Sequence, residues 1–263
     1  MRRFRLTRRC ASAFPLGQLA QSHPLGGARK QYKLKGIVAM SHKGFTAQHR
    51  VVGQVAAWIG FAAMQGYSVA SGLGFLSLES PLDPIGAPFL PIMALLLILT
   101  VSLMVVTMVV VHAYAAPEHK VYSMTALAFI ILLAGITSSV NFAVLIVSSQ
   151  ADFAGAPWLP LFLPYKWPAV AYAMDIFAWD WFYALSMLFA APIFRGGRLE
   201  QMARIVMLVS GGLSLLGLIV LPFAVLPAVV ISIVGWGVGG AFVFLLLAIV
   251  FGRTQPGPGV RSA

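Results

Sequence analysis

Long stretches of this chain contain no charged residue, and they constrain the fold more than any other feature. Residues 51–78, 84–117 and 121–151 lack Asp, Glu, Lys and Arg, and so do the 48 residues between Arg204 and Arg253. A transmembrane helix needs about 20 consecutive, mostly apolar residues. With 60% hydrophobic and only 10% charged residues, the sequence therefore predicts an all-α, polytopic membrane helix bundle.

The uncharged stretches divide into six predicted transmembrane helices. Proline cannot donate to the helix hydrogen-bond ladder, so we expect a tight turn between Pro222 and Pro227, within the longest apolar run. The predicted helices comprise residues 51–75, 89–115, 122–148, 169–193, 203–222 and 228–251. They form one domain, residues 51–252, which follows a basic leader (residues 1–50) and precedes a short tail (residues 253–263); we expect the leader and the tail to be disordered.

Lys and Arg are unequally distributed between the two sides of the predicted bundle. Cytoplasmic loops of membrane proteins carry an excess of these residues. They occur in the leader, in residues 117–120 and 194–204, and in the tail, whereas the alternate connections contain only Lys166. The sequence therefore predicts that both ends of the chain lie inside the cell (N-in, C-in).

The net charge of +11 comes from the leader. Eleven of the 18 Lys and Arg lie in residues 1–50, which contain no acidic residue. A charge confined to the leader is not a nucleic-acid-binding face, so we expect no nucleic-acid partner. We expect translation to begin at Met40; a disordered basic tail and an Arg-rich targeting peptide are the alternatives. Cys10 is the only cysteine, which excludes an intrachain disulfide and a thiolate metal cluster.

Two aspartates, Asp175 and Asp180, interrupt the fourth predicted helix. A carboxylate at the centre of a transmembrane helix costs roughly 2.5–3.5 kcal/mol, and such residues usually have a function. On an α-helix, five residues correspond to a rotation of about 140°, so we do not expect the two to form a paired-carboxylate site. Counting twenty residues back from Phe194 places Asp175 in the outer headgroup layer. Asp180 lies deeper and is the stronger functional candidate, although a merely solvated position is the alternative.

Polar residues of three predicted helices lie at a comparable depth in the outer half of the bundle. If these helices adjoin, the amide of Asn141 is placed to donate to the aspartates, and a polar pocket opens outward. The candidate ligand- or proton-binding residues are Asp180, Asn141, Gln65, Asp175 and Tyr183.

Small residues four positions apart predict faces for close helix packing. Such pairs occur in the sixth, fifth and first predicted helices, as Gly235 and Gly239, Ser210 and Ser214, and Ala62 and Gly66.

Motifs for catalysis, metal binding and nucleotide binding are missing from the sequence. There is no HExxH motif, histidine pair, P-loop or dinucleotide fingerprint. We therefore expect no metal, no cofactor and no enzymatic activity.

The segment AMDIFAWDWFYALSMLFAAPIFRGGRLE, which comprises the fourth predicted helix and the loop after it, resembles bacterial multi-span integral membrane proteins of uncharacterised activity. The resemblance implies no activity and no residue roles. We expect a multi-pass protein of a cell membrane, the bacterial inner membrane in particular.

Our leading expectation for function is a small-solute permease or a ligand-binding membrane protein, in which Asp180 binds a proton or another cation. Its partners are then the lipid bilayer and a small solute or proton. A non-catalytic structural or sensory membrane subunit is the alternative, and a membrane-embedded enzyme is the third.

Overall fold

The structure, a computed structural model, describes residues 45–80, 83–147, 155–163 and 167–255. The predicted start at Met40, most of the basic leader, the tail from residue 256 and Lys166 lie outside the described residues. Every regular element within the described ranges is helical, as predicted.

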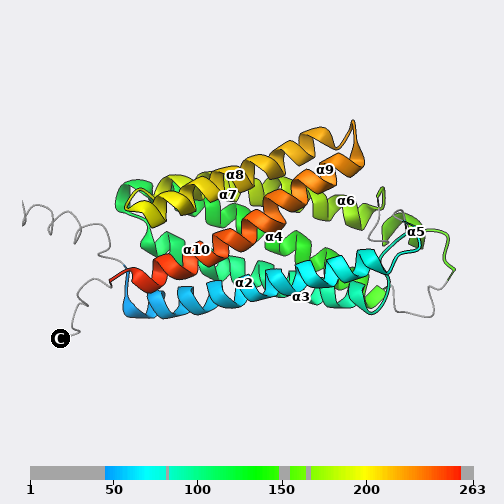
Figure 1. Cartoon of the computed structure of the whole chain (residues 1–263), viewed down its shortest axis with the longest axis horizontal. Helices are drawn as coiled ribbons and strands as arrows, with labels where there is room; N and C mark the ends of the chain where they lie inside the picture. The colour runs from blue at the N-terminus through cyan, green and yellow to red at the C-terminus, as the bar shows by residue number, and fades with distance from the viewer. Residues whose placement is uncertain (1–44, 81–82, 148–154, 164–166, 256–263) are drawn as a thin grey trace, which may run out of the picture. The chain divides into compact units, whose positions relative to one another are not determined.

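Six long helical segments run back and forth along the bundle (Figure 1). The first three are α2 (Ala47–Leu76), α3 (Phe89–Tyr114) and α4 (Lys120–Val147). The fifth is α8 (Arg198–Val220). The fourth consists of α6 (Val170–Phe177), the π-helical segment η3 (Ala178–Tyr183), α7 (Ala184–Ala190) and the 3₁₀ turn η4 (Ala191–Ile193). The sixth consists of α9 (Val225–Ser232), the π-helical segment η5 (Ile233–Val238) and α10 (Gly239–Arg253). Short helices η1 (Pro117–His119) and α5 (Leu159–Phe162) lie in the connections.

Five of the described helical segments are long and apolar enough to cross a membrane. They are residues 89–114, 117–147, 170–193, 198–220 and 225–253. The first segment, α2, is not among them, because glycines and the amides of Gln54 and Gln65 lower its hydropathy. Five such helices are typical of a multi-span membrane protein, in which backbone hydrogen bonds are satisfied within each helix.

The six segments pack as a closed ring. Segment α2 packs against α3 and α10, α3 packs against α4, and α4 packs against the composite helix from α6 to α7. That helix packs against α8, which in turn contacts α9 and α10. Neighbours in the sequence are therefore neighbours in the bundle, and the last segment returns to the first.

The turn before α9 is shorter than the sequence predicts. Helix α9 begins at Val225, so Pro227 lies inside its first turn rather than at the edge of the turn. This position tolerates proline because the first N–H groups of a helix have no acceptor within the helix.

The predicted small-residue faces of the fifth and sixth helices do meet. A Cβ atom on Gly235 would lie 2.7 Å from the backbone nitrogen of Ser214, and one on Gly239 would lie 2.6 Å from the Ser210 hydroxyl. Only glycine allows this approach. The pair in α2 does not form a comparable contact, since Ala62 is exposed.

One end of the bundle, where α2 begins and α10 ends, is filled by aromatic side chains; we call it the closed end. The ring of Tyr114 lies 5.7 Å from that of Phe194 and 5.7 Å from that of Phe45. The Phe251 ring completes the cluster, 6.1 Å from Phe45. The Arg50 guanidinium donates to the carbonyl oxygen of Gly252 at 2.6 Å, which ties α2 to the end of α10.

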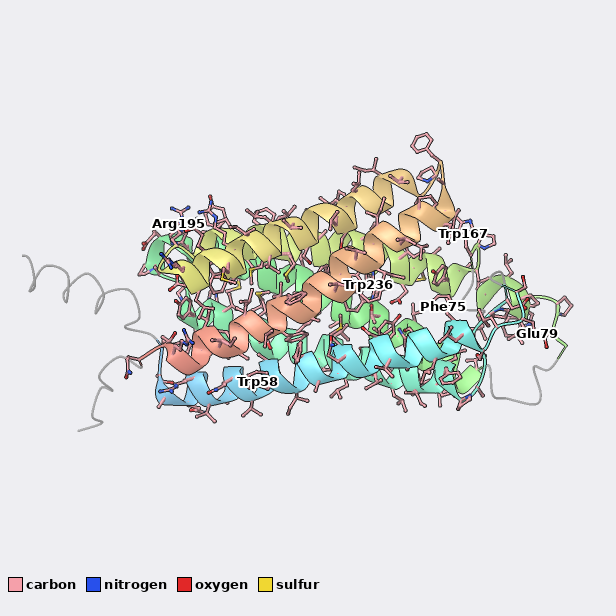
Figure 2. The ribbon with its side chains drawn as sticks, in the orientation of Figure 1. Trp58, Phe75, Glu79, Trp167, Arg195 and Trp236 are labelled. Carbon is pink, nitrogen blue, oxygen red and sulfur yellow. The ribbon has the colours of Figure 1, made fainter. Side chains whose placement is uncertain are left out.

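Glu200 joins three elements at the closed end. One carboxylate oxygen accepts from the Tyr114 hydroxyl at 2.8 Å, and the other accepts from the backbone N–H groups of Arg195 (3.1 Å) and Gly196 (2.7 Å). Arg195 and Glu79 mark the two opposite ends of the bundle (Figure 2). We call the end near Glu79 the open end.

Candidate functional site

The open end contains a cavity of about 650 Å³. It is lined by α2, by α6 and η3, and by α9 and η5. Phe75, Trp167 and Trp236, three of the lining residues, are labelled in Figure 2. A volume of this size lies within the usual range of small-molecule sites.

Both aspartates of the fourth segment line this cavity. Asp180 is 1% exposed; its Oδ2 accepts a hydrogen bond from the Ser232 hydroxyl at 2.6 Å. Its other oxygen, Oδ1, is buried and has no hydrogen-bond partner among the described residues. Asp175 is 4% exposed and accepts from the Thr137 hydroxyl at 2.9 Å. A buried carboxylate oxygen without a donor is costly, which makes Asp180 a group that needs a ligand, a proton or water.

Both aspartates line one cavity, although a regular α-helix would turn them about 140° apart. That α-helical value assumes 3.6 residues per turn throughout, whereas Ala178–Tyr183 is a π-helical segment with wider turns. A wider turn rotates the chain less per residue, so the five-residue step from Asp175 to Asp180 leaves both side chains facing one cavity. Asp175 is buried within the protein; its depth in the headgroup layer stays a prediction.

The two π-helical segments face each other across the bundle and bring tryptophans together. The rings of Trp179 in η3 and Trp236 in η5 are 4.7 Å apart, and Tyr67 of α2 lies 5.8 Å from Trp236. All three residues line the cavity. The indole N–H of Trp179 is buried and has no acceptor among the described residues. π-turns inside α-helices occur frequently at functional sites, and here each supplies an aromatic wall.

The remaining predicted site residues lie outside the cavity. Asn141 is buried, but its amide donates to the backbone oxygen of Thr137 at 2.9 Å, one turn earlier in its own helix. Gln65 is exposed on α2 and is not among the described residues that line the cavity. Tyr183 is buried one turn beyond Asp180, and its hydroxyl is hydrogen-bonded to that of Ser210 at 2.6 Å. The amide groups predicted for the pocket therefore do not contribute to it.

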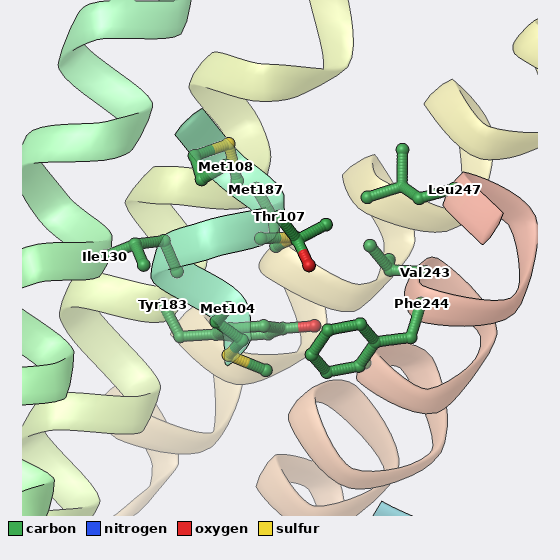
Figure 3. Close-up of a pocket in the computed structure, with 10 residues that line it drawn as sticks. Met104, Thr107, Met108, Ile130, Tyr183, Met187, Val243, Phe244 and Leu247 are labelled. Carbon is green, nitrogen blue, oxygen red and sulfur yellow. The ribbon is translucent and has the colours of Figure 1, made fainter. Parts of the chain in front are cut away.

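Tyr183 borders a second, much smaller void of about 20 Å³, shown in Figure 3. Phe244 and Met104 lie beside Tyr183, and Thr107 is a polar residue in the lining, with a buried hydroxyl that has no partner among the described residues. A void of this size can hold about one water molecule. It shares no described lining residue with the cavity; Tyr183, which borders it, lies one helical turn beyond Asp180.

Sequence reasoning missed Ser232 and Trp236. Ser232 is the only Ser, Thr, Asn or Gln between Pro222 and Gly252, and a lone hydroxyl in such an apolar run is a signal for an intramembrane polar contact. Trp236 lies away from the predicted membrane surface, where tryptophan is usual. Both signals were present, but neither identifies the partner helix.

The charged side chains among the described lining residues of the cavity are all acidic. Asp83, Asp175 and Asp180 line it, and no Lys, Arg or His is among its described lining residues. Within the described part of the chain, no group of three or more His, Cys, Asp or Glu is placed to hold a metal ion. Carboxylates in the lining are suited to holding a positively charged group.

Comparison with protein-family models, with curated proteins and with solved structures found no match to this chain.

Proposed function

We propose that this chain is a solute-binding membrane protein of the permease type, which admits a small solute to the cavity at its open end. In this proposal the protein crosses the bacterial inner membrane six times. Helix α2 provides one crossing in addition to those of the five apolar segments. Its 30 residues correspond to about 45 Å of helix, which exceeds the roughly 30 Å of hydrocarbon.

The charges at the two ends of the bundle support an orientation with the closed end inside the cell. Arg50, Lys120, Arg198 and Arg253 lie at helix ends on the closed side. The open side has Glu79 and Asp83 in the connection after α2. Because basic residues favour the cytoplasmic side, the cavity opens outward in this proposal.

The single observation that carries the proposal is the half-paired carboxylate of Asp180 in a cavity of about 650 Å³. A structural role would favour satisfying both oxygens, because a buried acceptor without a donor destabilises the fold. Asp180 instead leaves Oδ1 without a partner in a site large enough for a small molecule. Binding of a proton or another cation at this oxygen supplies the missing interaction.

Passage across the membrane requires the cavity to connect to the other side. In this proposal the path runs past Tyr183, which borders the small void and is hydrogen-bonded to Ser210 of α8. Transport in this proposal involves separation of these helices and loosening of the closed end, as in rocking-type transporters.

A ligand sensor is the second candidate, and the closed end favours it. Glu200 and the aromatic cluster around Tyr114 tie α3, α8 and α10 together at that end. A bundle that stays closed there binds a ligand without passing it on. Both candidates are non-catalytic and share the same cavity.

Uptake into proteoliposomes tests the proposal and separates the two candidates. We would measure uptake of a labelled panel of amines, amino acids and sugars, with and without a pH gradient, for the wild type, D180N and E79Q. We expect uptake of at least one class, lowered at least about tenfold by D180N, a loss of about 1.4 kcal/mol. Glu79 is an exposed carboxylate at the same end that does not line the cavity, so E79Q should match the wild type.

Uptake no greater than in protein-free liposomes, or unchanged uptake by a folded D180N variant, would contradict the permease proposal. Ligand-induced stabilisation without uptake would favour the sensor.

A further inference from the structure

We infer that the ligand of the cavity is an amphipathic organic cation: a protonated amine or quaternary ammonium group attached to an aromatic or branched apolar body. This inference rests on the proposed solute-binding function and names the substrate class of the same site.

The charge of the lining selects a cation. Asp175 and Asp180 lie deep in the cavity, and Asp83 is exposed at its edge. Without a described Lys, Arg or His in the lining, an anion or the carboxylate of a zwitterion finds no counter-charge there. Asp180 lines the cavity, and its buried Oδ1 has no hydrogen-bond partner among the described residues. A carboxylate oxygen accepts strongly from an ammonium N–H.

The aromatic wall selects an organic cation over a bare metal ion. Trp236 contacts both Trp179 and Tyr67 at ring distances of 4.7 and 5.8 Å. The faces of such rings attract ammonium groups, and tryptophan does so most strongly. Calcium and magnesium instead require six or more oxygen ligands, whereas aromatic and aliphatic side chains dominate this lining.

The mouth of the cavity selects an apolar body. Phe75, Leu226 and Ile233 line the cavity and are at least 37% exposed. These side chains come from α2, α9 and η5. A ligand whose charged group reaches Asp180 therefore has its remaining atoms among large hydrophobic side chains.

Three probes that share a phenyl ring and differ in charge test the inference on the wild-type protein. They are 2-phenylethylamine, which is cationic at pH 7, 2-phenylethanol, which is neutral, and 3-phenylpropanoate, which is anionic. Binding to the purified full-length protein in detergent is followed by isothermal titration and by the rise in Tm, which grows with ligand concentration over Kd. We expect the amine to bind at least tenfold more tightly than the alcohol and the anion not to bind.

Two pairs of variants test whether the preference for the amine arises in the cavity. D180N should reduce the ratio of amine to alcohol affinity to about one, whereas E79Q should leave it unchanged. W236L should weaken amine binding several-fold more than W58L, because Trp58 is an exposed tryptophan of α2 that does not line the cavity. The comparison of the three probes on the wild type stands without any variant, should D180N or W236L fail to fold.

Equal affinity for amine and alcohol, preference for the anion, or no binding of any probe would overturn the inference. Its failure is distinguishable from failure of the proposed function. Uptake of a sugar or amino acid without amine binding would retain the permease and reject the ligand class. Amine binding without uptake of any solute would retain the ligand class and reject the permease.

Discussion

Both ends of the bundle contain carboxylates and aromatic rings. They differ in whether the carboxylate oxygens have hydrogen-bond partners and whether the rings pack into a filled core. At the closed end, both oxygens of Glu200 accept hydrogen bonds, and the Tyr114 and Phe194 rings stack against each other. At the open end, Asp180 has one unpaired oxygen, and Trp236 borders a cavity instead of a filled core. Carboxylates and aromatic rings therefore stabilise one end and leave the other available for a ligand.

Polar residues inside the membrane-spanning region do not by themselves identify a site. Ser210 and Tyr183 are as deeply buried as Asp180, yet they are paired with each other and with the helix backbone. What distinguishes Asp180 is unsatisfied hydrogen-bonding capacity next to open volume. Stability and binding should therefore respond oppositely to substitutions at the two ends.

The largest expected effect comes from removing a phenylalanine at each end. Phe194 is fully buried at the closed end, whereas Phe75 is 54% exposed at the open end. We expect F194A to lower the free energy of unfolding by about 3–5 kcal/mol because it leaves a cavity. F75A should change it by less than about 0.5 kcal/mol. Denaturation in mild detergent, followed by tryptophan fluorescence, measures both; equal losses would remove the distinction between the ends.

The next effect concerns the carboxylates. Glutamine at position 200 keeps only one accepting oxygen, so E200Q loses either the bond from Tyr114 or those from the backbone of residues 195 and 196. A hydrogen bond to a charged group contributes about 1.5–3 kcal/mol, and we expect a destabilisation of that order. E79Q, at the open end, should be neutral. A stability of E200Q equal to that of the wild type would show that the closed end does not depend on this network.

The smallest expected effect is a gain in stability, in the D180N variant. Asn at position 180 still accepts from Ser232 and removes a buried charge with an unpaired oxygen. We expect D180N to be as stable as the wild type or more stable by about 1 kcal/mol, while its uptake and amine binding fall. The same denaturation experiment provides the measurement. Marked destabilisation would indicate that Asp180 serves the fold rather than a ligand.

The sequence predicted the positions of the helices well, because charge-free runs and prolines mark where apolar helices begin and end; five of these helices are long and apolar enough to cross a membrane. It also predicted close-packing faces of small residues on the fifth and sixth helices, and the structure brings these two faces together at Gly235 and Ser214. These are local properties that each helix carries in its own sequence.

The candidate site was predicted less well for two physical reasons. The π-helical segment around Asp180 changes the rotation per residue, so a helical wheel separated two aspartates that line one cavity. Depth in the membrane also says nothing about which way a side chain faces. Gln65 and Asn141 were predicted for the site from their depth, but one is exposed and the other is hydrogen-bonded to its own helix.

Cysteine accessibility tests the central claim of an outward-opening cavity most directly. Cys10 is the only native cysteine, so single-cysteine variants are made on a C10S background. S71C places a thiol in the cavity lining. G197C places one on the exposed loop of the closed end, where an added Cβ meets no neighbour.

Intact cells are treated with a membrane-impermeant, cationic thiol reagent. We predict that S71C is labelled from outside and protected by 2-phenylethylamine, and that G197C is labelled only after the membrane is permeabilised. Labelling of G197C in intact cells, or no labelling of S71C from outside, would contradict the account.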